Sequence, residues 1–286
     1  MSEVFTDNLY VAASLNLVTQ AIQIGAYAAR FAGVITGRIA TAISLFSLFV
    51  TASRLANLVV TPALGALADH PANAAVRAHQ SAVSPHALHV FDTQMRIIVA
   101  SGSLGILIGG LLMPLFVVLF VRGVRSFERT GSIPRTMLRL LDPRVVGGVL
   151  REFRMPALAD ARALPFGAIP RALLIGNTVI MLVYSIGVVA AYYASVLNLD
   201  ARGTAIGLSG LVNGIGTVAF SLFVDPNSAY IVDQTVRGER PESHVRAMIA
   251  SLVITAFVGT VLAQLVLYPA AQYIALAAHI FVPAKH

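Results

Sequence analysis

The chain has 286 residues, of which 57% are hydrophobic and 12% charged, and it contains no cysteine. A soluble domain carries about 25% charged residues, so this composition argues against a soluble protein and indicates a polytopic membrane protein. The absence of cysteine excludes disulfides and thiolate chemistry. The acidic start, MSEVFTDN, lacks the basic region of a cleaved signal peptide, so we expect the first apolar run to remain as a helix.

Six apolar runs are long enough to cross the hydrocarbon core of a bilayer, which takes about 20 helical residues. They lie at residues 9–29, 39–67, 97–121, 172–199, 204–224 and 247–267. The sequence therefore predicts an all-α polytopic membrane protein, with six transmembrane helices in a single domain that spans residues 1–286. Pro269 follows the sixth run, and we expect the apolar stretch after it to lie at the outer interface or bend back, within an external tail at 270–286.

The net charge of +7 is unevenly distributed among the loops. Loop one holds Arg30 and Arg38, loop three (122–171) holds ten arginines, and loop five holds three more. By the positive-inside rule, these loops are cytoplasmic and both termini lie outside. The positive charge is then explained by topology and by attraction to anionic membrane lipids, and no nucleic-acid partner is expected.

The two largest loops differ in composition. Loop three contains the stretch IPRTMLRLLDPRVVGGVLREFRMP, which mixes arginine with apolar residues at roughly helical spacing and predicts interfacial amphipathic helices. Loop two (68–95) is external and holds four histidines, but none of them has convincing metal-ligand spacing. We predict neither a metal site nor a cofactor.

Polar residues recur at helical spacing within three of the runs, so each set shares one helix face. The sets are Asn16, Gln20, Gln23, Tyr27 and Arg30; Ser44, Ser47, Thr51, Arg54 and Asn57; and Gly210, Asn213, Thr217, Ser221 and Asp225. One interpretation is hydrogen bonding between helices, and the other is a shared polar cavity. The small-residue pairs Gly105/Gly109 and Gly210/Gly214 predict close helix packing.

Arg54 lies deep inside the second run, where an arginine costs at least about 2.5–3.5 kcal/mol on insertion scales. It either snorkels outward, pairs with a carboxylate such as Asp69, or lines a cavity and meets an anion. None of the six runs contains an acidic residue, and this favours an anion supplied by a ligand. A guanidinium suits phosphate because its planar fork donates two hydrogen bonds.

The stretch YAARFAGVITGRIATAISLFSLFVTASRLAN resembles the signature region of the Amj family, the alternate lipid II flippases of bacteria. The matching positions are Tyr27, Arg30, Gly33, Arg38, Arg54 and Asn57. The Val-Asp-Pro at 224–226, followed by Asp233 and Gly238, is similar to the family's fifth-loop pattern.

The resemblance implies a multi-pass protein of the bacterial cytoplasmic membrane that moves lipid II, an undecaprenyl-pyrophosphate-linked disaccharide pentapeptide, to the outer leaflet. Arg30 and Arg38 would capture the pyrophosphate, and Arg54 with Asn57 would receive it on the outer side. The remaining predicted binding residues are Asn16, Gln20, Gln23, Asn213, Asp225 and Asp233. No P-loop is present, so ATP is not the direct drive.

Other functions stay open at this point. The chain could transport a different anionic lipid or solute, or serve as a scaffold that moves no lipid. The GLSG motif at 207–210 resembles that of rhomboid proteases, with Ser209 and His279 as a conceivable catalytic pair. The energy source and a homodimeric state are likewise undecided by the sequence.

Overall fold

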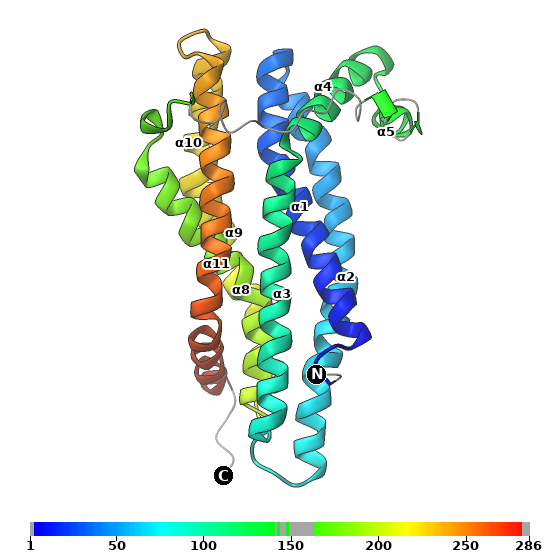
Figure 1. Cartoon of the computed structure of the whole chain (residues 1–286), viewed down its shortest axis with the longest axis vertical. Coiled ribbons are helices and arrows are strands. Elements are labelled where there is room, and N and C mark those ends of the chain that lie inside the picture. Colours follow the sequence, from blue (N-terminus) through cyan, green and yellow to red (C-terminus); the bar gives the residue numbers. More distant parts are fainter. Residues whose placement is uncertain (1–2, 141, 144–146, 149–162, 282–286) are drawn as a thin grey trace.

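The computed structural model describes residues 3–140, 142–143, 147–148 and 163–281, with backbone alone at residues 49, 52–54, 56–57, 133–134, 137 and 140. Throughout this part the regular elements are helical and no strand occurs (Figure 1). The helices are α1 (Asp7–Thr36), α2 (Ile39–Arg77), α3 (Pro85–Leu111), α4 (Met113–Thr130), α5 (Ile133–Leu140), α8 (Arg171–Leu197), α9 (Arg202–Ala219), α10 (Asp225–Val236) and α11 (Glu242–Phe281). A short 3₁₀ turn (Phe166–Ala168) precedes α8, and a π-helical turn (Phe220–Val224) joins α9 to α10.

The long helices run alternately up and down through an elongated bundle (Figure 1). The start of α1, the turn between α2 and α3, and the end of α11 lie at one end. The turn between α1 and α2, the helices α4 and α5, and the turn between α10 and α11 lie at the other, which we call the basic end because its arginines include Arg38, Arg122, Arg125, Arg129, Arg135, Arg139, Arg237 and Arg240. The two groups of loops separated by charge thus correspond to the two ends of the bundle.

Five helical segments among the described residues are long and apolar enough to cross a membrane: α1, α3, α8, α9 with α10, and α11. Helix α2 contains a shorter apolar stretch, Ile39–Leu48, and is 39 residues long in all. The chain is therefore a helical membrane protein. Six spans with both termini outside remain a prediction.

The connection between α1 and α2 is only two residues long because glycine permits it. Gly37 ends α1 with a φ of 67°, a left-handed conformation that costs glycine little. Four residues earlier, a Cβ on Gly33 would lie 2.8 Å from the Cα of Ile39, so only glycine lets α2 fold back this closely. This tight turn places Arg30 of α1 beside the first turns of α2.

The third predicted span, 97–121, is wrong at both bounds. Helix α3 begins at Pro85, capped by the Ser84 hydroxyl, and ends at Leu111. A new helix, α4, then starts, with Pro114 in its first turn, where the missing amide hydrogen does no harm. Hydropathy missed the first turns of α3 because they contain Asp92 and Arg96. These two form an i,i+4 ion pair, so the helix includes both charges at reduced cost.

Two predicted loops and the predicted C-terminal tail are largely helical. Loop two shrinks to residues 78–84, because α2 continues through Pro71 to Arg77. Loop five is helical up to Val236, so Asp225 and Asp233 belong to α10. Of the two alternatives for the tail, bending back after Pro269 is wrong, since α11 passes this proline and continues to Phe281; a position at the outer interface stays a prediction. Membrane helices tolerate proline where neighbouring helices compensate for the lost hydrogen bond.

Glycines set how closely the helices pack. A Cβ on Gly105 would collide with the carbonyl oxygen of Leu17, and one on Gly109 would lie 2.7 Å from that of Ala21, which confirms close packing of α3 on α1. The same prediction is wrong for Gly210 and Gly214, where a Cβ would meet nothing within 4 Å. That face of α9 is open to its surroundings.

Candidate functional site

A pocket of about 500 Å³ opens near the basic end, between the α1–α2 turn region and α10. One guanidinium and one carboxylate face it in a largely apolar wall. The lining residues are Arg30, Ile39, Ile43, Pro226, Ala229, Tyr230, Val232 and Asp233. Three positions that the sequence singled out therefore lie in or beside one cavity: Arg30, Asp233 and Asp225, which precedes Pro226.

The Arg30 side chain is the most buried charge of this pocket, with 14% of its surface exposed. Its Nη2 donates a hydrogen bond to Oδ1 of Asp225, which is 42% exposed. Its Cζ lies 5.9 Å from the centre of the Tyr27 ring, a cation–π contact that orients the guanidinium. Its Nη1 is buried and has no hydrogen-bond acceptor among the described residues. Half of the guanidinium fork is thus unused.

The π-helical turn determines where Asp225 lies. The Asp225 amide donates to the carbonyl oxygen of Phe220, five residues earlier, and Pro226 has no amide hydrogen with which to continue the ladder. The helix therefore changes register at this point before α10 begins. Isolated π turns inside α-helices are frequent at functional sites.

The Tyr27 hydroxyl is hydrogen-bonded to a buried asparagine of α8. The hydroxyl donates to Oδ1 of Asn177 at 3.3 Å, while the Asn177 Nδ2 donates to the carbonyl oxygen of Leu252 and to Oγ1 of Thr255, both at 2.9 Å. Asn177 is fully buried in α8. This hub ties α1 to α8 and α11, and it holds in place the Tyr27 ring that contacts the Arg30 guanidinium.

Comparison with known proteins shows the family of the chain. The family model described as "Amj: Alternate to MurJ" matches residues 15–278. A curated protein of Bacillus subtilis (strain 168), named lipid II flippase Amj, is 31% identical over 276 residues, which cover 96% of this chain and 98% of that protein. The chain belongs to the Amj family. No solved structure matches it.

The positions that carried the resemblance to the Amj family separate in space. Tyr27, Arg30 and Asp225 come together at the basic-end pocket. Arg38 points elsewhere: it is 63% exposed and its Nε donates to Glu128 of α4 at 2.7 Å. Asp233 lines the pocket but is ion-paired with Arg237, the residue that follows the end of α10.

Arg54 and Asn57 lie in the middle of α2, and their side chains are outside the part that the structure describes. The carboxylate suggested as a partner for Arg54, that of Asp69, binds Arg202 of α9 instead. The inference that no span contains an acid is wrong, because α3 contains Asp92 and the α9–α10 segment contains Asp225.

The polar stripe of α1 is divided between packing and surface. The Asn16 Nδ2 donates to the carbonyl oxygen of Ile98 on α3 at 2.8 Å, and Gln20 is buried against Gly102 of the same helix. Gln23 is exposed. On α9, Asn213 turns its Oδ1 toward Gly187 of α8, and that oxygen has no donor among the described residues.

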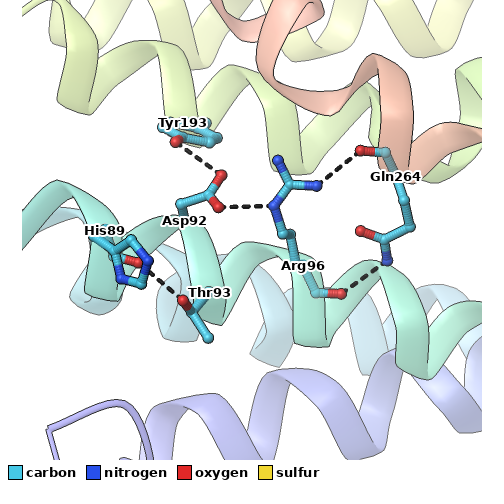
Figure 2. A network of polar contacts seen from close by, with 6 residues as sticks. All are labelled: His89, Asp92, Thr93, Arg96, Tyr193 and Gln264. Carbon is cyan, nitrogen blue, oxygen red and sulfur yellow. Dashed lines mark hydrogen bonds and ion pairs between the residues drawn. The ribbon is translucent and has the colours of Figure 1, made fainter.

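Sequence reasoning missed a polar network that crosses the bundle (Figure 2). Asp92 of α3 accepts from the Tyr193 hydroxyl of α8 at 2.9 Å and from Nε of Arg96 at 2.7 Å. Arg96 donates to the carbonyl oxygen of Gln264 on α11 at 2.9 Å, and the Gln264 amide returns a bond to the Arg96 carbonyl at 3.0 Å. The four-residue spacing of Asp92 and Arg96 could have indicated this ion pair from the sequence.

A second pocket, of about 560 Å³, lies at the opposite end between the N-terminal segment, α2 and α3. It brings His70 and His86 into one cavity, with Nε2 of His86 3.0 Å from Oε2 of Glu3. Across the described residues, no three His, Asp or Glu side chains are grouped closely enough to hold a metal ion. At the same end, His279 is hydrogen-bonded to Asn198, not to Ser209.

Proposed function

We propose that the chain moves lipid II from the inner to the outer leaflet of the bacterial cytoplasmic membrane, as a transporter and not an enzyme. Membership of the Amj family and the name of the B. subtilis relative support a lipid II flippase. The arginine-rich end of the bundle, which the positive-inside rule assigns to the cytoplasm, is the end from which such a substrate would enter.

The observation that carries the proposal is Arg30 in the basic-end pocket. Its guanidinium has one nitrogen without an acceptor among the described residues and lies in an apolar wall, where a charge-assisted bond to phosphate is stronger than in water. A lipid pyrophosphate has the matching chemistry, an anion joined to an apolar chain. Ile39, Ile43 and Val232 would contact the first part of that chain.

The volume of the pocket limits what it could recognise. About 500 Å³ accommodates a pyrophosphate with its neighbouring groups but is too small for a disaccharide pentapeptide as well. In this proposal the sugars and peptide extend from the pocket toward Gln23 on α1 and Asn213 on α9. Arg38 makes the first contact at the mouth, while Arg54 and Asn57, further along α2, receive the pyrophosphate later.

The test is flipping of fluorescent lipid II in vesicles that contain the purified protein. Loss of a hydrogen bond to a charged group costs about 1.5–3 kcal/mol, so we expect Arg30→Ala to slow flipping roughly tenfold or more. Arg246→Ala is the matched control, because Arg246 is an exposed arginine near the same end, ion-paired to Glu242 at 3.7 Å. Flipping at the wild-type rate by folded Arg30→Ala protein would refute the proposed role of the pocket.

A further inference from the structure

We propose that Asp225 is an intramolecular competitor for the anion site. Its carboxylate binds one edge of the Arg30 guanidinium, and the phosphate of the substrate takes its place, which releases α10 from α1 and widens the pocket. This inference rests on the proposed function, since it assigns a regulatory step to the same arginine.

The hydrogen-bond geometry supports competition. Asp225 engages Arg30 through a single nitrogen, Nη2, while the buried Nη1 has no acceptor among the described residues. A carboxylate can accept both bonds of the fork, so the observed pair is an incomplete version of the strongest arrangement. A phosphate group offers more acceptor oxygens and a larger charge, and can bind both nitrogens. It is therefore the stronger ligand for the same guanidinium.

The helix that carries Asp225 lies between two backbone irregularities. The π turn Phe220–Val224 precedes α10, and Gly238 follows it with a φ of 76°. Hinges are formed by a few residues at the ends of elements, where a change in backbone angles is absorbed. Helix α9, on the far side of the π turn, is mostly exposed and packs chiefly on α8, so it imposes little restraint on α10.

Movement of α10 would change the pocket directly. One wall consists of Ile39 and Ile43 from the start of α2, and the opposite wall consists of Ala229, Tyr230 and Asp233 from α10. The Arg30–Asp225 ion pair joins the two sides. Asp233 does not hold α10 to α1, because its partner is Arg237 of its own segment. Breaking this ion pair removes the charged contact between the two walls and, among the described residues, leaves only apolar packing, through Ile231 and Val232, to hold α10 against α1.

The absence of cysteine from the chain makes the distance between the walls measurable. Ile43→Cys and Ala229→Cys would place one spin label on each wall at exposed positions. Double electron–electron resonance spectroscopy would then measure the distance between the two labels. We expect inorganic pyrophosphate or undecaprenyl pyrophosphate to shift the distribution to longer distances. A response to both probes supports recognition of the anion alone. A response to undecaprenyl pyrophosphate alone supports the same opening of the pocket and shows that it also requires the lipid tail.

The decisive variant is Asp225→Asn in this doubly labelled protein. We expect the longer distances without any ligand and, because the competing carboxylate is gone, roughly threefold to tenfold tighter binding of pyrophosphate. Glu242→Gln is the control, since it removes one carboxylate from an exposed ion pair at the same end. It should change neither quantity.

Two results would overturn the inference. In the first, Asp225→Asn weakens pyrophosphate binding in a protein that unfolds at the wild-type temperature, which makes Asp225 a clamp that positions Arg30. In the second, the labels stay at their original separation although pyrophosphate binds and Arg30→Ala abolishes flipping. The second result leaves the transport site intact and rejects only the gate. If wild-type protein binds neither probe, the proposed function fails together with the inference.

Discussion

The network in Figure 2 leads to a prediction about Tyr193, in which one hydroxyl is removed without disturbing the surrounding packing. Tyr193 is 2% exposed, and its ring makes edge-on contacts with Phe91 and Tyr268 at centroid distances of 5.5 and 5.7 Å. Tyr193→Phe keeps these ring contacts. It deletes only the 2.9 Å hydrogen bond that the hydroxyl donates to Asp92.

The expected cost follows from the state of the carboxylate. A hydrogen bond to a charged group contributes about 1.5–3 kcal/mol. Asp92 retains Arg96 as its partner, and its side chain is 24% exposed, so water can replace part of the lost bond. We therefore expect the lower half of that range, about 1.5–2 kcal/mol off the free energy of unfolding.

Reversible unfolding in mixed detergent micelles would measure the change. Tyr268→Phe is the matched control, because its hydroxyl makes no hydrogen bond to any described residue. We expect this variant to lie within about 0.5 kcal/mol of wild type. The double variant with Asp92→Ala should cost less than the sum of the two single changes, since both remove the same bond. Wild-type stability of Tyr193→Phe, or strict additivity, would refute the network as a source of stability.

Two further predictions concern packing between helices, and the same unfolding measurement tests both. Gly105→Ala should destabilise the protein by about 1–3 kcal/mol, because the added methyl group meets the Leu17 carbonyl oxygen. Gly214→Ala, where the methyl group enters open space, should be neutral or slightly stabilising. A larger loss of stability in Gly214→Ala than in Gly105→Ala would contradict the observed packing. Asn177→Leu should cost about 2–4 kcal/mol, since it removes the buried hydrogen bonds to α1 and α11. An effect no larger than that of an exposed substitution would show that the hub is dispensable.

Composition and charge patterning predicted the class of protein and the segregation of arginines, because both follow from the energetics of the bilayer. The exact ends of the helices could not be predicted in the same way. A hydropathy scale assigns Asp92 and Arg96 a separate free-energy cost of burial each, whereas in the folded helix the two form an ion pair that lowers this cost. Pro269 was expected to interrupt the chain, although α11 continues through it to Phe281.

Part of the candidate site could be predicted, most specifically from the resemblance to the Amj family. That resemblance singled out Arg30 and Asp225, nearly 200 residues apart along the chain, and the structure joins them in an ion pair. Helical periodicity alone gave a stripe on α1 whose members separate: Asn16 and Gln20 pack against α3, while Gln23 is exposed. Periodicity identifies a shared face, but it cannot tell whether that face meets a neighbouring helix or a cavity.

The reciprocal bonds between Arg96 and Gln264 have a mechanical consequence. They fasten α3 to α11 through each other's backbone, about six helical turns along α11 from its start at Glu242. A rocking motion that preserves these bonds has its fulcrum there, and α11 acts as a lever. From Gln264 to Glu242 that lever is about 33 Å long, so a tilt of about 10° displaces its far end by about 6 Å. A small rotation at the fulcrum is thus amplified at the mouth of the bundle.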